Sequence, residues 1–294
     1  MDRRDPERTP GGEPRSAWRT PEGRRLLACL GRHERLAVAF SGGVDSTLLL
    51  AAAREALEGR VLAVTAETDL QSRREVRAAA ETARRLGVPQ VRVRVALLAR
   101  PAIARNGPAR CYFCKRLLLR ELGRAAARAG FAALAHGANL DDLQDIRPGL
   151  RAAREMGVAE PLIAAGLDKA AIRRLSRRLA LPTWDRPAMA CLASRIPYGR
   201  PLRRSELAAV ERAEEFLLAR GFSGVRVRHH GEIARIEARP EDLPRLAASP
   251  LREEIRRAFR GLGFAHVALD LEGYVAGSLN RTLPGRARRK GGGR

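Results

Sequence analysis

Short apolar runs alternate with stretches of helical periodicity along the first two thirds of the chain. The apolar runs predict four β-strands, at Leu36–Phe40, Val61–Thr65, Val91–Val95 and Ala132–Ala135. The amphipathic stretches predict helices at Thr47–Leu57, Arg73–Leu86, Lys115–Ala129 and Asp168–Leu179, the last with an aspartate at its N-cap. Strands alternating with helices of this length are typical of an α/β fold, a parallel sheet with helices on both faces. Because arginines alternate with the valines in the third strand, we place that strand near a sheet edge.

The pattern changes after about residue 200. The elements predicted there are a helix at Ser205–Arg220, strands at Val225–His229 and Ala234–Ala238 around a turn at Gly231, a helix at Pro250–Leu262 and a strand at His266–Leu271. This order within about 80 residues indicates a smaller, separate α+β domain.

Both ends of the chain are polar and rich in Pro, Gly or Arg. We therefore predict a disordered arm over residues 1–20, an α/β domain over 21–200, a small domain for substrate binding or oligomerisation over 201–283, and a basic flexible tail over 284–294. No apolar run approaches the roughly 18–20 residues of a membrane span. The first twenty residues have no apolar stretch like that of a signal peptide, so we expect a cytoplasmic protein.

The charge of the chain allows two explanations. The 294 residues include 56 basic and 33 acidic side chains, a net charge of +23, and 45% are hydrophobic, enough for a folded core. A nucleic-acid partner would explain this excess. Coding bias would explain it equally, because Lys115, Lys169 and Lys290 are the only lysines and 53 basic residues are arginine, in a chain also rich in alanine.

A glycine-rich loop with the sequence SGGVDS stands between the first predicted strand and the first predicted helix. Its two glycines allow a tight turn and close approach to a ligand, and its amides converge on an anion at the helix N-terminus. Asp45 would repel a bare phosphate, so it suits a Mg²⁺ ion that bridges to the phosphate. The residues expected to contact the nucleotide are Ser41, Gly42, Gly43, Val44, Asp45 and Ser46, with Thr65 at the end of the next strand.

This strand–loop–helix sequence resembles the PP-loop of the ATP pyrophosphatase family, whose members cleave ATP between the α- and β-phosphates. The resemblance implies adenylation, in which a substrate oxygen attacks the α-phosphate and pyrophosphate departs. The loop would hold the leaving group.

Cysteines form a second candidate site. Cys111 and Cys114 lie three residues apart where a loop enters a helix, a position that favours thiolate. A lone CxxC is compatible with a redox pair, half a zinc site or coincidence. Cys191 lies in an irregular segment rich in Pro and Gly, whereas Cys29 follows Leu26 and Leu27 in a helix-like run and is explained by core packing.

Several motifs in order make the resemblance narrower. They are SGGVDS, Arg110–Lys115, Gly137–Asn139 with Asp141 and Asp142, Arg147–Gly149, Cys191–Gly199, Val225–Arg228 and Ala234–Glu237. Together, over about residues 25–283, they resemble the LarE-like family of ATP-dependent sulfur transferases, which helps to make the nickel-pincer nucleotide of lactate racemase. The resemblance implies adenylation of a carboxylate of pyridinium-3,5-biscarboxylic acid mononucleotide, followed by sulfur insertion to a thiocarboxylate.

The resemblance also assigns residues. Cys191 matches the sulfur-bearing cysteine, which some members sacrifice to leave dehydroalanine. With Cys111 and Cys114, the chain is similar instead to three-cysteine members that hold a [4Fe–4S] cluster, whose free iron binds a sulfide for transfer.

Two further sets of residues follow from the resemblance. The substrate phosphate would be bound by Ser194, Arg226 and Arg228, the two arginines sharing one face of a strand. Glu214 and Glu237 match two carboxylates of a family metal cluster. The third position falls on or near Arg245, with Asp242 close by, a departure that speaks against this cluster.

We therefore expect an enzyme that uses Mg²⁺-ATP, delivers sulfur from a site on its three cysteines, and acts on a small phosphorylated pyridinium substrate. Further copies of the chain are expected partners; membranes and nucleic acid are not. Two alternatives remain: a PP-loop tRNA thiolase, which the +23 charge would suit, and a nucleotide-binding protein that has lost turnover.

Overall fold

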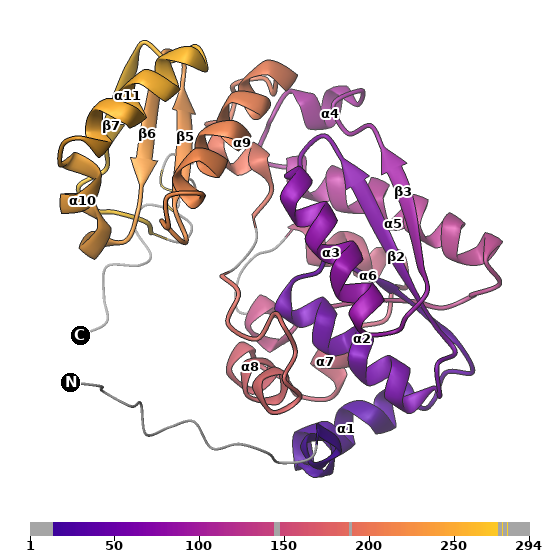
Figure 1. Cartoon of the computed structure of the whole chain (residues 1–294). Helices are drawn as coiled ribbons and strands as arrows, with labels where there is room; N and C mark the ends of the chain where they lie inside the picture. The colour runs from indigo at the N-terminus through magenta and orange to yellow at the C-terminus, as the bar shows by residue number, and fades with distance from the viewer. Residues whose placement is uncertain (1–13, 144–147, 188–189, 276–277, 279–280, 282–294) are drawn as a thin grey trace, which may run out of the picture. The chain divides into compact units, whose positions relative to one another are not determined.

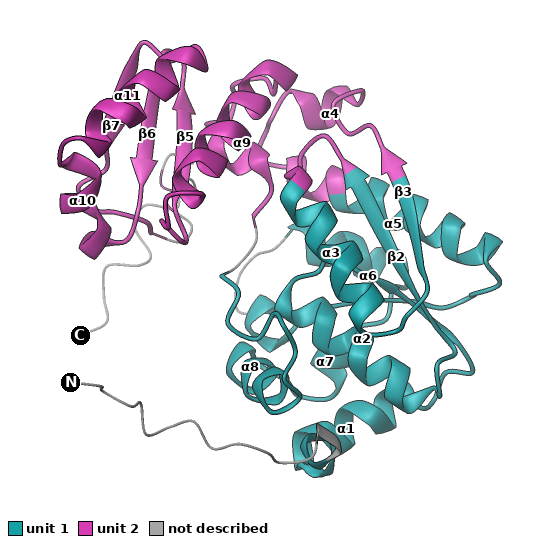
Figure 2. Ribbon diagram, viewed as in Figure 1, with its two compact units in different colours: residues 1–67, 74–93, 115–188 teal, residues 68–73, 94–114, 189–294 magenta. Residues whose placement is uncertain are grey.

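The computed structural model describes residues 14–143, 148–187, 190–275, 278 and 281 (Figure 1). Residues 1–13 of the expected arm, the tail over 284–294 and Arg147 lie outside these residues. The chain divides into two compact units (Figure 2). Unit 1 comprises residues 1–67, 74–93 and 115–188, and unit 2 comprises residues 68–73, 94–114 and 189–294.

Unit 1 is built on a four-stranded parallel sheet. Its strands, in the order β3-β2-β1-β4, are β1 (Leu36–Ala39), β2 (Val61–Thr68), β3 (Gln90–Val95) and β4 (Leu134–His136). The central strand β1 pairs with β2 through Ala37 and Leu62, and with β4 through Ala37 and Leu134. The arginine-bearing strand β3 lies at the edge, as its pattern predicted.

Helices flank this sheet (Figure 1). They are α1 (Pro21–Leu30), α2 (Val44–Ala56), α3 (Arg73–Arg85), α5 (Arg110–Arg128), α6 (Pro148–Glu155), α7 (Pro161–Ala164) and α8 (Lys169–Arg178), with a short 3-10 helix η2 (Leu140–Leu143). Helix α2 is fully buried at Leu48, Leu49 and Leu50, so it forms the centre of the core. Asp168 caps α8 by accepting a hydrogen bond from the Ala171 amide at 2.7 Å. The α/β prediction is confirmed.

The N-terminal segment differs from its expected disorder where the structure describes it. Pro14–Arg19 form a 3-10 helix, η1, whose Trp18 is buried against the core of unit 1. Thr20 then caps α1 by accepting a hydrogen bond from the Gly23 amide at 3.1 Å. The prediction of a disordered arm is therefore wrong for Pro14–Thr20, because one tryptophan buries enough apolar area to fix a segment that is otherwise polar.

Unit 2 contains the smaller sheet, which is mixed. Strands β5 (Arg226–His230) and β6 (Ile233–Glu237) are antiparallel, and β6 is parallel to β7 (His266–Leu269). The helices of the unit are α4 (Pro101–Ala104), α9 (Arg204–Leu218), α10 (Leu243–Ala247) and α11 (Leu251–Gly261), with 3-10 helices η3 (Leu192–Arg195) and η4 (Pro240–Asp242). Phe222 and Phe259 are fully buried in its core. A small C-terminal α+β region is confirmed.

The units do not divide at residue 200, as the sequence had suggested, because residues 94–114 and 189–200 belong to unit 2. The buried side chain of Asn106 explains this. Its Nδ2 donates to the carbonyls of Ile196, Pro197 and Arg200 at 3.3, 2.8 and 3.0 Å. Within the described part of the chain, no helix is both long and apolar enough to cross a membrane.

Candidate functional site

The SGGVDS loop joins β1 to α2 in unit 1. Gly42 has φ +76°, and a Cβ there would lie 2.9 Å from Cα of Ala79, so glycine is required on both counts. The hydroxyls of Ser41 and Ser46 lie 3.1 Å apart, and the Gly43 amide donates to Ser41 Oγ at 3.4 Å. Among the described residues no side chain caps the N-terminus of α2. The loop thus presents hydroxyls and the positive end of a thirteen-residue helix, the arrangement expected of a phosphate site.

Asp45 lies in the first turn of α2 and is held by Lys169 from the start of α8. Lys169 Nζ donates to Oδ1 at 2.6 Å and to Oδ2 at 2.5 Å, so both carboxylate oxygens face one cation. The side chains are 23% and 33% exposed, so the pair is reachable by solvent. Asn139 Nδ2 also donates to Asp45 Oδ1, at 3.4 Å.

The segment after β4 completes this part of the site. A Cβ on Gly137 would lie 2.9 Å from the Ser46 amide nitrogen and 3.1 Å from the Asp45 carbonyl carbon, so the segment packs directly on the loop. Asp141, in the segment after β4, accepts a hydrogen bond from the Lys169 amide at 3.1 Å. This bond holds the start of α8 against that segment. Lys169 was not among the predicted site residues. Its rarity was a usable signal for a site residue, because only three of the 56 basic residues are lysine.

Thr65 has a structural explanation. Its buried hydroxyl donates to the Phe40 carbonyl at 2.9 Å and accepts from Gln90 Nε2 at 2.8 Å, which links three neighbouring strands. Its expected contact with a nucleotide stays a prediction.

Cys111, Cys114 and Cys191 all belong to unit 2, and none of the three forms a disulfide in the part of the chain that the structure describes. Helix α5 begins at Arg110, earlier than predicted, so both cysteines of the CxxC motif lie in its first turns. Cys191 is the N-cap residue of η3.

A buried arginine connects the two cysteine segments. Arg110 donates to the Ala193 carbonyl in η3 at 3.1 Å, approaches Cys111 Sγ at 3.7 Å, and also bonds Asn106. Burial opposes the charge of Arg110, but the nearby Cys191 and Cys111 outweigh it and raise the pKa of this guanidinium. Arg110 thus places positive charge close to the thiols of Cys111 and Cys191.

Within the described residues, no group of three or more His, Cys, Asp or Glu side chains is placed to hold a metal ion. The iron–sulfur cluster expected at Cys111, Cys114 and Cys191 therefore stays a prediction.

The residues expected to bind the substrate phosphate come together in unit 2. Arg228 Nη1 donates to the Ser194 carbonyl at 2.8 Å, so η3 lies against β5. Arg226 lies two residues away on the same strand, and its pKa is lowered by burial and by the neighbouring Arg195. Two adjacent, poorly solvated guanidinium groups favour an anion beside them. Arg195, which was not among the predicted site residues, also donates to Ser194 Oγ at 2.9 Å.

The two candidate metal carboxylates are instead paired with arginines. Glu214 binds Arg195 at 2.8 and 2.9 Å, and Glu237 binds Arg228 at 2.6 Å and Arg235 at 2.9 Å. Arg245, at the third position of the family cluster, donates to the Arg220 carbonyl. The described residues thus use these carboxylates as ion-pair partners, and the departure at Arg245 agrees with that use.

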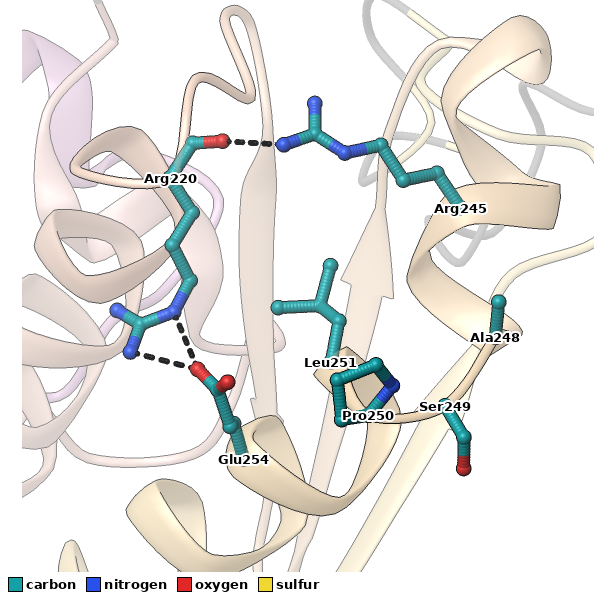
Figure 3. A pocket seen from close by; sticks show the side chains of 7 residues that line it. All are labelled: Arg220, Arg245, Ala248, Ser249, Pro250, Leu251 and Glu254. Carbon is teal, nitrogen blue, oxygen red and sulfur yellow. Dashed lines mark hydrogen bonds and ion pairs between the residues drawn. The ribbon is translucent and has the colours of Figure 1, made fainter.

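Unit 2 also contains an open pocket of about 390 Å³ between α9, α10 and α11 (Figure 3). It is lined by Arg220, Arg245, Ala248, Ser249, Pro250, Leu251 and Glu254. Arg220 is paired with Glu254 at 2.9 and 3.0 Å in its wall. Arg245 is the one lining residue that the sequence analysis also named, at the third position of the family cluster.

Comparisons with known proteins agree with a nucleotide site at the SGGVDS loop. Residues 28–104, which contain the loop, match the family model described as asparagine synthase. The chain is 39% identical over 258 residues to an uncharacterised protein of Synechocystis sp., covering 88% of this chain and 96% of that relative. It is 28% identical over 243 residues to an uncharacterised protein of Methanocaldococcus jannaschii, covering 83% and 92%.

A further relative has a named activity. The pyridinium-3,5-bisthiocarboxylic acid mononucleotide synthase of Lactiplantibacillus plantarum is 37% identical over 262 residues, which cover 88% of this chain and 93% of the relative. Identity at this level along nearly the whole of both chains, with an ATP-binding PP-loop in place, shows common family membership. The chain belongs to the family of the pyridinium-3,5-bisthiocarboxylic acid mononucleotide synthases.

Proposed function

We propose that the protein is an ATP-dependent sulfur transferase that adenylates a carboxylate of pyridinium-3,5-biscarboxylic acid mononucleotide and replaces one carboxylate oxygen with sulfur. The observation that carries the proposal is the SGGVDS loop with Asp45 fixed beside Lys169 and Asn139, in a chain 37% identical to the synthase. The product would be the thiocarboxylate of the nickel-pincer nucleotide.

Adenylation needs stabilisation of the departing pyrophosphate. The substrate carboxylate attacks the α-phosphorus, the bond to the β-phosphate oxygen breaks, and negative charge grows on the leaving group. The N-terminus of α2 supplies preorganised donors for such charge, and the hydroxyls of Ser41 and Ser46, which are bonded within the loop in this structure, lie beside it.

The residues present also fit a Mg²⁺ ion. Asp45 is partly exposed, already neutralises a cation with both oxygens, and lies at the loop that would bind the triphosphate. When bound, Mg²⁺ supplies Lewis-acid stabilisation of the phosphate oxygens. Asp45 would hold it, next to Lys169, whose ammonium group is bonded to that carboxylate in this structure.

The substrate phosphate is assigned to unit 2. Arg226 and Arg228 lie on one strand, and Ser194 is fixed beside them by Arg228 and Arg195.

Sulfur transfer is assigned to the three thiols. The sulfur of Cys191 attacks the acyl carbon of the adenylate, AMP leaves with the electron pair of the broken C–O bond, and a thioester to Cys191 forms. Loss of the Cα proton of Cys191 to a base then breaks its Cβ–sulfur bond, and the electron pair stays on sulfur. The products are the thiocarboxylate and dehydroalanine at position 191. Cys191 is the proposed carrier, Cys111 and Cys114 belong to the same unit, and Arg110 is a cation close to both Cys111 and Cys191.

The proposal is tested by an anaerobic assay with Mg²⁺-ATP and the biscarboxylic mononucleotide. We expect AMP, pyrophosphate and a product in which sulfur has replaced oxygen by mass. No AMP from intact protein would support a binding protein without turnover. Tight tRNA binding with a steep salt dependence, without reaction on the mononucleotide, would favour the thiolase alternative.

A further inference from the structure

Lys169 occupies the side of Asp45 where a divalent cation would bind. Its ammonium group lies within 2.6 Å of both carboxylate oxygens, so both of the oxygens on that side are already used by one cation. Mg²⁺ binds carboxylate oxygen at about 2.0–2.1 Å, so an ion that approaches both oxygens from this side would meet the ammonium group. On this side of Asp45 the metal and the ammonium therefore compete for the same oxygens.

The chain has a strong preference against lysine, which makes this position unusual. Arginine is used at 53 of 56 basic positions. Lys115 and Lys169 are the two lysines among the described residues, and Lys169 is the one bonded to a carboxylate of the nucleotide loop. Coding bias alone would favour arginine here.

Arginine and lysine differ in how firmly they hold a carboxylate. Arginine forms a planar two-point pair, whereas lysine offers a compact charge on a flexible stem. Such a two-point pair between arginine and a carboxylate occurs in unit 2, where two nitrogens of Arg195 donate to the two oxygens of Glu214. A lysine can swing away, while an arginine would remain fixed on both oxygens.

Neighbouring hydrogen bonds hold the backbone of Lys169 in place, so its ammonium group stays near Asp45 after it leaves the carboxylate. The Lys169 amide is bonded to Asp141, and Asp168 caps the same helix turn, so the backbone stays in place when the side chain moves. The pair is also partly exposed, at 33% for Lys169 and 23% for Asp45, so solvent and ions can reach it.

We propose that Lys169 is an exchangeable placeholder for the divalent cation at Asp45: it neutralises the carboxylate in the free protein and yields it when metal and nucleotide bind. The lysine is then a positioning residue that sets the metal affinity, and its identity as lysine is the functional requirement. This inference rests on the proposed function for the metal and ATP site.

The test measures Mn²⁺ binding by electron paramagnetic resonance, with and without a non-hydrolysable α,β-methylene ATP analogue. In Lys169→Arg we expect the Mn²⁺ dissociation constant to rise roughly tenfold, because the two-point pair competes more strongly with the metal. In Lys169→Met, which removes the competitor, we expect Mn²⁺ to bind more tightly than in the wild type when nucleotide is absent. A purely structural ion pair would not predict opposite shifts.

Arg174→Lys is the matched control, because Arg174 lies on the same helix in an exposed pair with Glu22 and should leave Mn²⁺ binding unchanged. Thermal unfolding establishes that each variant is folded. Equal Mn²⁺ affinity in the wild type, Lys169→Arg and Lys169→Met would overturn the inference. Since this readout needs no turnover, it separates the inference from the proposed function, which fails if the wild type forms no AMP.

Discussion

Arg195 and Glu214 form a two-point ion pair in the interior of unit 2, with Nε to Oε1 at 2.8 Å and Nη2 to Oε2 at 2.9 Å. The same carboxylate accepts the Val227 amide at 3.0 Å, and the same guanidinium donates to Ser194 Oγ at 2.9 Å. One buried pair therefore connects α9, β5 and η3. This connection fixes Ser194 beside the arginines of β5.

Removing Glu214 should destabilise unit 2. In Glu214→Ala, the buried Arg195 loses its counter-charge, and loss of one partner of a buried pair costs about 3–5 kcal/mol. We expect a large drop in the urea midpoint. The control is Glu254→Ala, whose pair with Arg220 is substantially exposed and should be worth about 1 kcal/mol or less. If Glu214→Ala instead released bound metal without loss of stability, the ion-pair assignment would be contradicted.

Gly137→Ala should weaken ATP binding. The added Cβ would lie 2.9 Å from the Ser46 amide nitrogen, so the loop or the segment after β4 has to move. We expect the free energy of unfolding to fall by about 1–3 kcal/mol. We also expect the dissociation constant for ATP to rise by roughly tenfold or more. Isothermal titration calorimetry with the methylene analogue measures the affinity.

Gly123→Ala is the control for this change. Gly123 lies within α5, and a Cβ there meets nothing within 4 Å. It should leave affinity unchanged and stabilise the protein by about 0.5–1 kcal/mol, the usual gain of alanine over glycine in a helix. Equal effects of the two substitutions would show that the close approach at Gly137 is unimportant.

Periodicity in the sequence predicted the sheets, because buried strands and amphipathic helices require it. Elements such as β1 and α8 lie within a few residues of their predicted ends. Periodicity gave no sign of η1, where a single tryptophan provides the burial, or of the first turn of α5, where Arg110 is buried through polar contacts.

The candidate site was predictable only where its residues are consecutive in sequence. The loop is a local motif, so its position followed directly. Lys169 and Asp45 are 124 residues apart, and no spacing rule connects them. The same holds for Asn106, whose bonds to the segment at 196–200 make unit 2 discontinuous in sequence.

Asp45→Asn should abolish AMP formation. The amide keeps the size of the side chain but removes the negative charge that holds a divalent cation, so we expect a loss of at least about 100-fold in pyrophosphate release. Glu55→Gln, an exposed change of the same kind on α2, should be silent. Turnover retained in Asp45→Asn would exclude Asp45 as the metal ligand.

His136 should make stability depend on pH. Burial, with Lys115 and Arg154 nearby, lowers the pKa of this histidine from 6.5 to about 3. The unfolded chain therefore binds a proton that the folded protein does not, and the stability from His136 is complete above about pH 6.5 and falls as the pH drops toward 3. We expect a loss on the order of 2 kcal/mol between about pH 7 and pH 5.

Urea unfolding at several pH values measures this effect. His136→Gln should flatten the profile in this window while His33→Gln, which changes a histidine on the same unit outside that buried site, should leave it intact. An unchanged profile in His136→Gln would show that other groups carry the pH dependence.

The three thiols of unit 2 should act together in sulfur chemistry. If they carry an iron–sulfur cluster, anaerobic reconstitution with iron and sulfide gives broad visible absorbance, and alanine at Cys111, Cys114 or Cys191 each removes it. Cys29→Ala is the control, because Cys29 packs against the core of unit 1 and should leave iron binding unchanged. Iron binding that persists in Cys191→Ala would contradict a shared site. Mass spectrometry after turnover then separates the two chemistries: an intact Cys191 supports catalytic delivery, whereas loss of its sulfur shows that the residue is consumed and that the protein acts once.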